Sequence, residues 1–107
     1  MNLSERIYIR EGQGSTGRIL YNFYDNLVRE GQTSTGRIVC NIDGNYIREG
    51  QTSTGRILYN LDGNWVRAGQ DPCGRILFNI DVPYIREGQH SLNRILYSLT
   101  QYNYLCE

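Results

Sequence analysis

At 107 residues, 39% of them hydrophobic, the chain can form one small domain with a modest core. Its eleven acidic and eleven basic residues cancel, so no net field attracts an anionic membrane surface or nucleic acid. This balance argues against nucleic-acid binding, whose affinity depends on phosphate neutralisation. Every basic residue is arginine, whose planar guanidinium suits fixed pairing and stacking on aromatic rings. We therefore interpret the arginines mainly as parts of ordered ladders.

A unit of 19 residues is repeated through nearly the whole sequence. Two sets of arginines keep this spacing without a slip: Arg10, Arg29, Arg48, Arg67 and Arg86, and then Arg18, Arg37, Arg56, Arg75 and Arg94. The repeats run over about 8–26, 27–45, 46–64, 65–83 and 84–99, and a tail follows at 100–107. Because a repeat array forms one architecture, we treat residues 1–107 as a single repeat domain.

Each repeat carries two short segments with strand character. In the third repeat they are YIRE at 46–49 and RILYNL at 56–61, both bounded by Gly, Asn, Asp, Ser and Thr. Side chains alternate along a strand, so Ile57, Tyr59 and Leu61 are expected on one face. That face is predicted to be the core, because its equivalents in the other repeats carry no charge.

An Asp-Gly pair between the two strands is typical of a two-residue hairpin turn. With Asp62-Gly63 as the turn, Tyr59 is expected opposite Val66, which then joins the core face. Different, longer turns are expected at 24–25 and 81–83, since Val82 resists the positive φ of a type I′ turn.

The strands at 8–11 and 94–99 begin and end a set of five complete hairpins, or ten strands. An open meander of this kind leaves two exposed edges. Pairing the strand around Ile9 with the strand around Ile95 removes both. The sequence thus predicts an all-β fold of five tandem hairpin repeats that form a closed, shallow, pseudo-fivefold antiparallel barrel. The alternative is a β-solenoid, which would stack like-charged arginines in columns.

The segment GRILYNLDGN at 55–64 and its copies resemble the short hairpin repeats of β-flower proteins, which are symmetric barrels of hairpin petals. The resemblance covers about residues 8–99 and rests on this half of the repeat. It implies a non-catalytic module with a likeness to lipid-associated Tubby-type barrels, and it brings no catalytic residues with it.

Several motifs imitate ligand sites without completing them. The segment GQTSTGR at 50–56 lacks the lysine and the following helix of a phosphate-binding loop. The turn from Asn60 to Asn64 supplies too few oxygen atoms for calcium. His90 is the only histidine, and with scattered cysteines it makes neither a zinc site nor a catalytic pair. We expect no cofactor, no metal and no enzymatic activity.

Three cysteines, Cys40, Cys73 and Cys106, stand at non-equivalent positions of the repeat. Their odd number argues against a disulfide framework and favours a reducing compartment. The beginning of the sequence has no apolar core of signal-peptide length, and no segment approaches the roughly 20 apolar residues of a membrane span. A cytoplasmic protein with no transmembrane segment is therefore expected.

Two functional hypotheses follow. The first is a structural or protein-interaction module that meets an unknown partner protein or its own copies. The alternative is a multivalent binding module for glycans or lipid headgroups, in which aromatic rings stack and polar groups donate and accept hydrogen bonds. The candidate ligand or partner surface consists of Tyr46, Arg48, Arg56, Asn60, Asp62, Trp65, Arg67, Tyr84 and Arg86.

Overall fold

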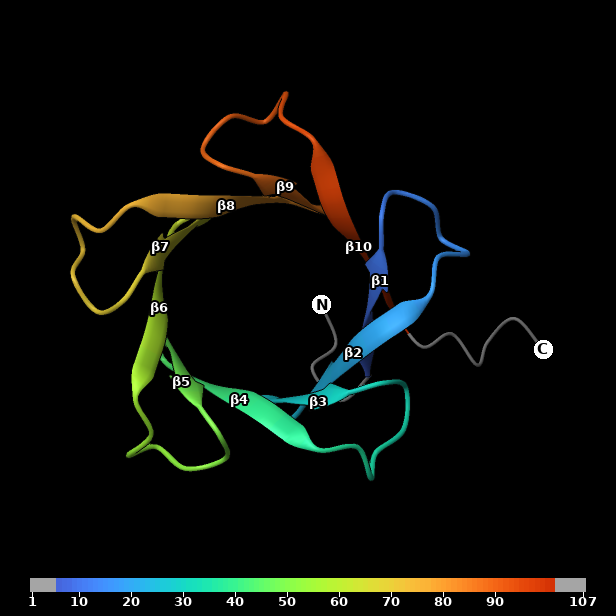
Figure 1. Cartoon of the computed structure of the whole chain (residues 1–107), viewed down its shortest axis with the longest axis horizontal. Helices are drawn as coiled ribbons and strands as arrows, with labels where there is room; N and C mark the ends of the chain where they lie inside the picture. Colours follow the sequence, from blue (N-terminus) through green and yellow to red (C-terminus); the bar gives the residue numbers. More distant parts are fainter. Residues whose placement is uncertain (1–5, 102–107) are drawn as a thin grey trace.

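The computed structural model describes residues 6–101, which contain ten strands and no helix (Figure 1). The strands are β1 (Ile7–Glu11), β2 (Ile19–Tyr24), β3 (Leu27–Glu30), β4 (Ile38–Asp43), β5 (Tyr46–Glu49), β6 (Ile57–Asp62), β7 (Trp65–Ala68), β8 (Ile76–Asp81), β9 (Tyr84–Glu87) and β10 (Ile95–Gln101). The two strands predicted in the third repeat therefore form within one residue of their expected bounds. Within this range no helix is long and apolar enough to cross a membrane.

The strands form a closed antiparallel barrel, in which each strand pairs with its neighbours in the sequence and β1 pairs with β10. Ile9 lies opposite Leu99 at this seam, so the predicted pairing of the first and last strands is confirmed. Figure 1 looks down the ring that results. Closure satisfies the backbone groups that a free edge would expose, and it excludes the solenoid.

The hairpin turn of the third repeat lies one residue later than predicted. Asp62 pairs with Trp65, so the turn residues are Gly63 and Asn64 rather than Asp62 and Gly63. The expected pairing of Tyr59 with Val66 is wrong, because Val66 lies opposite Leu61. The partner changes by two residues, which keeps the side chain of Val66 on the same face.

The turns at 25–26 and 82–83 also contain two residues, so the expectation of longer turns there is wrong. Asp25 and Asn26 adopt φ values of 54° and 66°, a conformation that aspartate and asparagine tolerate better than most residues. The peptide bond between Val82 and Pro83 is cis, and neither residue has a positive φ. The resistance of Val82 to positive φ thus changes the turn's conformation but not its length.

Longer connections of seven residues join the remaining strand pairs and project outward from the ring (Figure 1). We call them petals, and they span 12–18, 31–37, 50–56, 69–75 and 88–94. Backbone hydrogen bonds close each petal at its base: in the third repeat Glu49 N donates to Arg56 O at 2.8 Å, and Gly55 N donates to Thr52 O at 3.1 Å. The petals are therefore compact turns.

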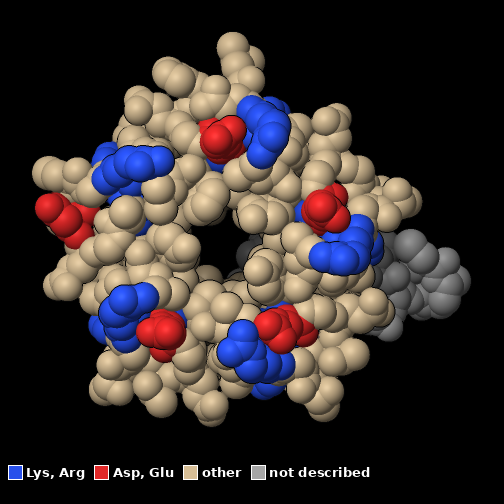
Figure 2. Space-filling view, in the orientation of Figure 1, with Lys and Arg blue, Asp and Glu red and all other residues tan. Residues whose placement is uncertain are grey.

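The described part of the barrel is not built around a conventional apolar core. Asn60 contacts a petal, so it faces outward, and its neighbours Tyr59 and Leu61 face the interior as predicted. A register shift between Ile57 and Tyr59 interrupts the alternation, so the predicted inward position of Ile57 does not follow from it. Figure 2 shows the ring hollowed at its centre. Among the described apolar residues Val66 is the most deeply buried, at 7% exposure. The most deeply buried residues are polar: Asn22, Asn41, Asn60, Asn79 and Ser98.

Part of the predicted tail belongs to the barrel. Thr100 and Gln101 extend β10 and pair with Tyr8 and Ile7 of β1. Residues 102–107, for which a plug, an added strand or a subunit contact was considered, lie outside the described residues.

Gly55→Ala is expected to destabilise the barrel, because a Cβ atom at residue 55 would overlap the carbonyl oxygen of Glu49. Such overpacking costs about 1–3 kcal/mol of unfolding free energy, which urea unfolding followed by circular dichroism measures. Gly14→Ala is the matched control, since the atoms nearest to its new Cβ would be 3.9 Å away. Equal losses in the two variants would contradict the steric explanation.

Candidate binding pockets between the petals

A buried amide side chain fastens each of four petals to the barrel. Asn60 on β6 is 5% exposed, and its Nδ2 donates to the carbonyl oxygens of Gly69 at 2.9 Å and Asp71 at 3.1 Å. Equivalent pairs of bonds are made by Asn22, Asn41 and Asn79. Leaving such a buried group unpaired costs about 1–3 kcal/mol, so these bonds fix the base of the petal against the sheet.

Arginine side chains clamp the petals to the hairpin turns. The guanidinium of Arg48 donates from Nε to Asp43 at 3.0 Å and from Nη1 to the carbonyl of Gly55 at 3.0 Å, and it lies 5.5 Å from the ring centre of Tyr46. Arg67 and Arg86 repeat this arrangement, with Trp65 and Tyr84 as their aromatic partners. Only Arg's planar, multiply donating head makes all three contacts at once.

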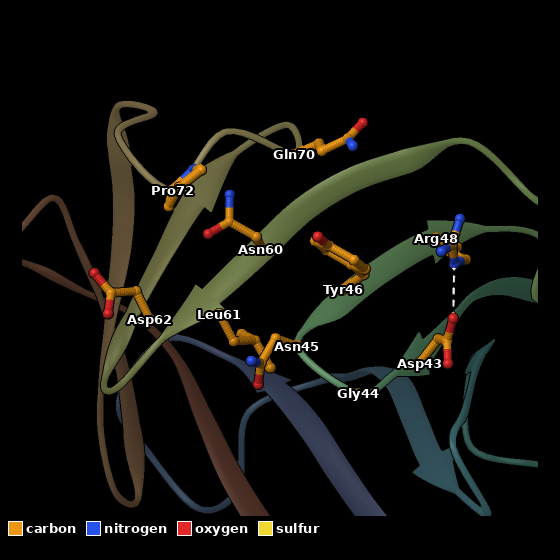
Figure 3. Close-up of a pocket in the computed structure, with 10 residues that line it drawn as sticks. All are labelled: Asp43, Gly44, Asn45, Tyr46, Arg48, Asn60, Leu61, Asp62, Gln70 and Pro72. Carbon is orange, nitrogen blue, oxygen red and sulfur yellow. Dashed lines mark hydrogen bonds and ion pairs between the residues drawn. The ribbon is translucent and has the colours of Figure 1, made fainter.

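A pocket of about 560 Å³ opens between the β4–β5 turn and the petal at 69–75 (Figure 3). Tyr46 and Asn60 lie side by side in it, because they are register partners on β5 and β6. The full lining consists of Asp43, Gly44, Asn45, Tyr46, Arg48, Asn60, Leu61, Asp62, Gln70 and Pro72. We call it the Asn60 pocket.

A second pocket of about 300 Å³ occurs one repeat later, and we call it the Asn79 pocket. Its lining is Asn64, Trp65, Asn79, Ile80, Asp81, Gln89, His90 and Ser91. Seven of these residues stand 19 positions after residues of the Asn60 pocket. The same positions of the repeat, and not chance surface irregularities, therefore build both pockets.

The amide oxygen of the asparagine is available inside these pockets. Both Nδ2 hydrogens of Asn60 and of Asn79 bond to petal carbonyls, but their Oδ1 atoms accept no hydrogen bond from any residue within 6–101. No buried side-chain nitrogen or oxygen atom of the described residues lacks a partner. These Oδ1 atoms are thus reachable from the pocket, and each offers an acceptor on a rigidly held group.

Five ion pairs join arginine and acidic side chains in the described part of the ring. Figure 2 shows basic and acidic groups side by side on the face in view, without a field of one sign. The ion pairs include Arg48 with Asp43 and Arg67 with Asp62, both at 3.0 Å. The lining of the Asn60 pocket itself contains two carboxylates and one guanidinium, so it favours a donor or a cation over an anion.

The predicted surface residues fall into three groups. Tyr46, Arg48, Asn60 and Asp62 line the Asn60 pocket, and Trp65 lines the Asn79 pocket. The clamps elsewhere in the ring contain Arg67, Tyr84 and Arg86. Arg56 lines neither pocket: its side chain is 75% exposed and lies 3.8 Å from Glu49.

Sequence reasoning missed the glutamine and the turn asparagine of each pocket. Gln70 and Asn45 line the first, and Gln89 and Asn64 line the second. A signal for the glutamine was present, since glutamine recurs at 13, 32, 51, 70 and 89 with the spacing of the repeat. Only the fold shows that it faces the turn of the neighbouring hairpin.

The thiols and the potential metal ligands within residues 6–101 are the remaining reactive side chains. No group of three or more His, Cys, Asp or Glu side chains there could hold a metal ion. Cys40 and Cys73 are free. Cys40 takes the inward position of Tyr59 in its repeat, and burial raises the pKa of its thiol, which lowers its nucleophilicity at neutral pH.

A family model described as "6-fold beta flower protein" matches residues 9–106. It covers both halves of the repeat, including the clamps and the pocket residues. No curated protein and no solved structure is significantly similar to the chain.

Arg48→Ala is expected to lower the free energy of unfolding by about 1–3 kcal/mol, because it breaks two charge-assisted hydrogen bonds of a side chain that is 19% exposed. Arg56→Ala removes the same group from a side chain that is 75% exposed, where an ion pair contributes roughly 0–1 kcal/mol. Urea unfolding compares the two variants. Similar losses would mean that the clamp contributes no more than a surface ion pair.

In a Cys106→Ser background, Cys73 is expected to react with iodoacetamide at lower pH than Cys40. Cys73 is exposed, whereas the raised pKa of Cys40 reduces its thiolate fraction at any given pH. Mass spectrometry of peptides alkylated between neutral and alkaline pH measures both rates. Faster modification of Cys40 at neutral pH would show that its site is more open than the structure indicates.

Proposed function

The chain belongs to the 6-fold beta flower family, and we propose that it is a non-enzymatic, multivalent protein-interaction module. Each pocket between petals holds one polar side chain of a partner. The observation that supports this proposal is the recurrence of one pocket design in consecutive repeats. Equivalent sites on one ring raise the overall affinity without any strong single contact.

We propose further that the ring is shallow and has approximate fivefold symmetry, one member fewer than the family description names. Five 19-residue copies in the sequence support this count. So do the matching registers of successive hairpins, in which Asp43 pairs with Tyr46, Asp62 with Trp65 and Asp81 with Tyr84. The extents of 45, 34 and 22 Å support a flat ring.

The paired charges favour a protein partner over a lipid surface. Recognition of anionic headgroups depends on clustered, unpaired basic residues. Here the basic side chains Arg48, Arg67 and Arg86 are only 16–19% exposed, and each is bonded to an aspartate. The exposed petal arginines stand one to a repeat and are spread around the ring, so they form no basic cluster: Arg18, Arg37, Arg56, Arg75 and Arg94. The acceptor-rich pockets suit the side chains of a protein.

Glycans are the second candidate, and the Asn79 pocket is the observation that favours them. It combines the indole of Trp65 with the side chains of Asn64, Asn79 and Asp81, and such sets of one ring and several polar groups orient small hydroxylated ligands. However, the guanidinium of Arg67 lies 5.3 Å from the centre of the indole and covers one of its faces. The reduced stacking surface places glycans second.

The test uses dodecapeptides selected from a random display library on the unmodified protein. Ser91→Trp fills the Asn79 pocket from the exposed petal at 88–94, so selected peptides are expected to bind that variant about tenfold more weakly through loss of one site. Leu92→Trp is the matched control, because residue 92 is 94% exposed and does not line the pocket.

Biolayer interferometry measures the affinities. Equal affinity for the two tryptophan variants, or no enrichment over an unrelated barrel, would refute the protein-interaction proposal. A glycan array probed with the same variants addresses the second candidate.

A further inference from the structure

One copy of the pocket position already holds a side chain. Arg6 precedes β1 at the repeat position that Gly44 takes beside the Asn60 pocket. Its Nη1 donates to Oδ1 of Asn22 at 2.7 Å, and its guanidinium carbon lies 4.8 Å from the ring centre of Tyr24. Asn22 corresponds to Asn60 in the repeat, so an arginine occupies the acceptor that stays open in the other copies.

Asn22, whose amide oxygen is occupied, is also more deeply buried than the other three asparagines. Asn22 is 0% exposed, whereas Asn41, Asn60 and Asn79 are 6%, 5% and 5% exposed. All four make the same two bonds from Nδ2 to a petal. The amide group is therefore built alike in all four repeats, and the guanidinium contact on Oδ1 is what distinguishes Asn22.

We propose that the sites at Asn41, Asn60 and Asn79 are receptors for guanidinium groups, and that the partner is a protein segment with exposed arginine side chains. This inference rests on the proposed function, for which it names the ligand group. The Arg6 contact supplies the binding geometry within the same chain. The open Oδ1 atoms supply the vacant acceptors.

Each vacant site has a carboxylate that the occupied site lacks, and this carboxylate strengthens guanidinium binding there. Where Asn22 has Tyr24 two residues later on the same face, the vacant sites have Asp43, Asp62 and Asp81. Oδ2 of each aspartate binds its own clamp arginine, while Oδ1 accepts no hydrogen bond from residues 6–101. A guanidinium on the asparagine oxygen thus has a carboxylate beside it, and charge-assisted bonds of this kind are the stronger ones.

The shape of the group favours arginine over lysine. A guanidinium is planar and carries several N–H donors at fixed angles, so it can bond the amide oxygen of Asn60 and the carboxylate of Asp62 together. At the occupied site the guanidinium of Arg6 also stacks on Tyr24, and at the vacant sites the carboxylate takes the place of that ring. An ammonium group is a point charge that gains neither advantage.

The fifth position lacks these acceptors and is not a receptor. Ser98 replaces the asparagine, and its Oγ donates to Gly14 O at 3.3 Å. Thr100 replaces the aspartate, and its Oγ1 accepts from Arg10 Nε at 3.0 Å. The ring therefore offers three vacant receptors, one site filled by Arg6 and one position without a receptor.

The experiment is a titration of the 15N-labelled full chain with N-acetyl-arginine amide, followed by the side-chain amide signals of the asparagines. One guanidinium is expected to bind with a dissociation constant on the order of millimolar. Signals of Asn41, Asn60 and Asn79 are expected to shift, and that of Asn22 to stay. N-acetyl-lysine amide is the matched ligand control and is expected to bind at least about tenfold more weakly.

Arg6→Ala vacates the occupied site, so the Asn22 signal is expected to join the others in responding to the arginine derivative. Arg37→Ala is the matched protein control, because that side chain is 74% exposed and its ion pair within residues 6–101 is with Glu30. The Nδ2 bonds of Asn22 do not involve Arg6, so the variant keeps its petal contact; Arg6→Gln provides a second variant if the alanine form does not fold.

Equal shifts with the lysine derivative would overturn the guanidinium assignment, as would a response of Asn22 in the unmodified protein or its silence in both Arg6 variants. Shifts of Asn41, Asn60 and Asn79 with N-acetylglucosamine but not with the arginine derivative would overturn the arginine partner and support glycans. No shift with any probe also overturns the inference. The protein-interaction proposal then depends only on the peptide comparison of Ser91→Trp with Leu92→Trp, so the two can fail separately.

Discussion

The carboxamide buried beneath a petal is the interaction on which the rest of the structure depends. At Asn60 it joins strand β6 to the carbonyls of Gly69 and Asp71, two groups that no regular sheet bond satisfies. The described interior provides little apolar burial, since Val66 is its one almost fully buried apolar side chain. Because a buried amide is stable only with its partners in place, each of the four petals held in this way takes one position, and the pockets beside them are formed before any ligand binds.

The two polar atoms of this amide have separate functions. Nδ2 holds the petal, and Oδ1 faces the pocket, so recognition uses an atom whose position is set by a structural bond. The arginines divide in a comparable way. Arg48 and its equivalents stabilise turns and petals, Arg56 lies in solvent, and Arg6 shows how a guanidinium fits the acceptor. Arginine suits all three settings because its donors are planar and its charge is permanent.

Sequence differences among the repeats alter the binding sites more than they alter the strand pairing of the barrel. The turn at 82–83 has a cis peptide where others have glycine in the left-handed region, yet Asp81 still pairs with Tyr84. By contrast, Ser98 removes one pocket acceptor and Leu27 removes one aromatic ring while the strands around them persist. A closed ladder of backbone bonds tolerates such changes, because pairing depends on register and not on one side chain. Repeats with the same strand pairing can therefore differ in what they bind.

The sequence by itself determined the period, the strands and the closure. Spacing of 19 residues, alternation around Ile57 and Tyr59, and the need to satisfy two edges are local or symmetric constraints that can be read without coordinates. The turn register was misjudged by one residue, because Asp62, Gly63 and Asn64 all favour turns and only strand pairing selects among them. Asn60 also looked like a free surface group. Only the tertiary structure decided that it is buried, because the petal that covers it comes from the next hairpin, a contact that no pattern within one repeat contains.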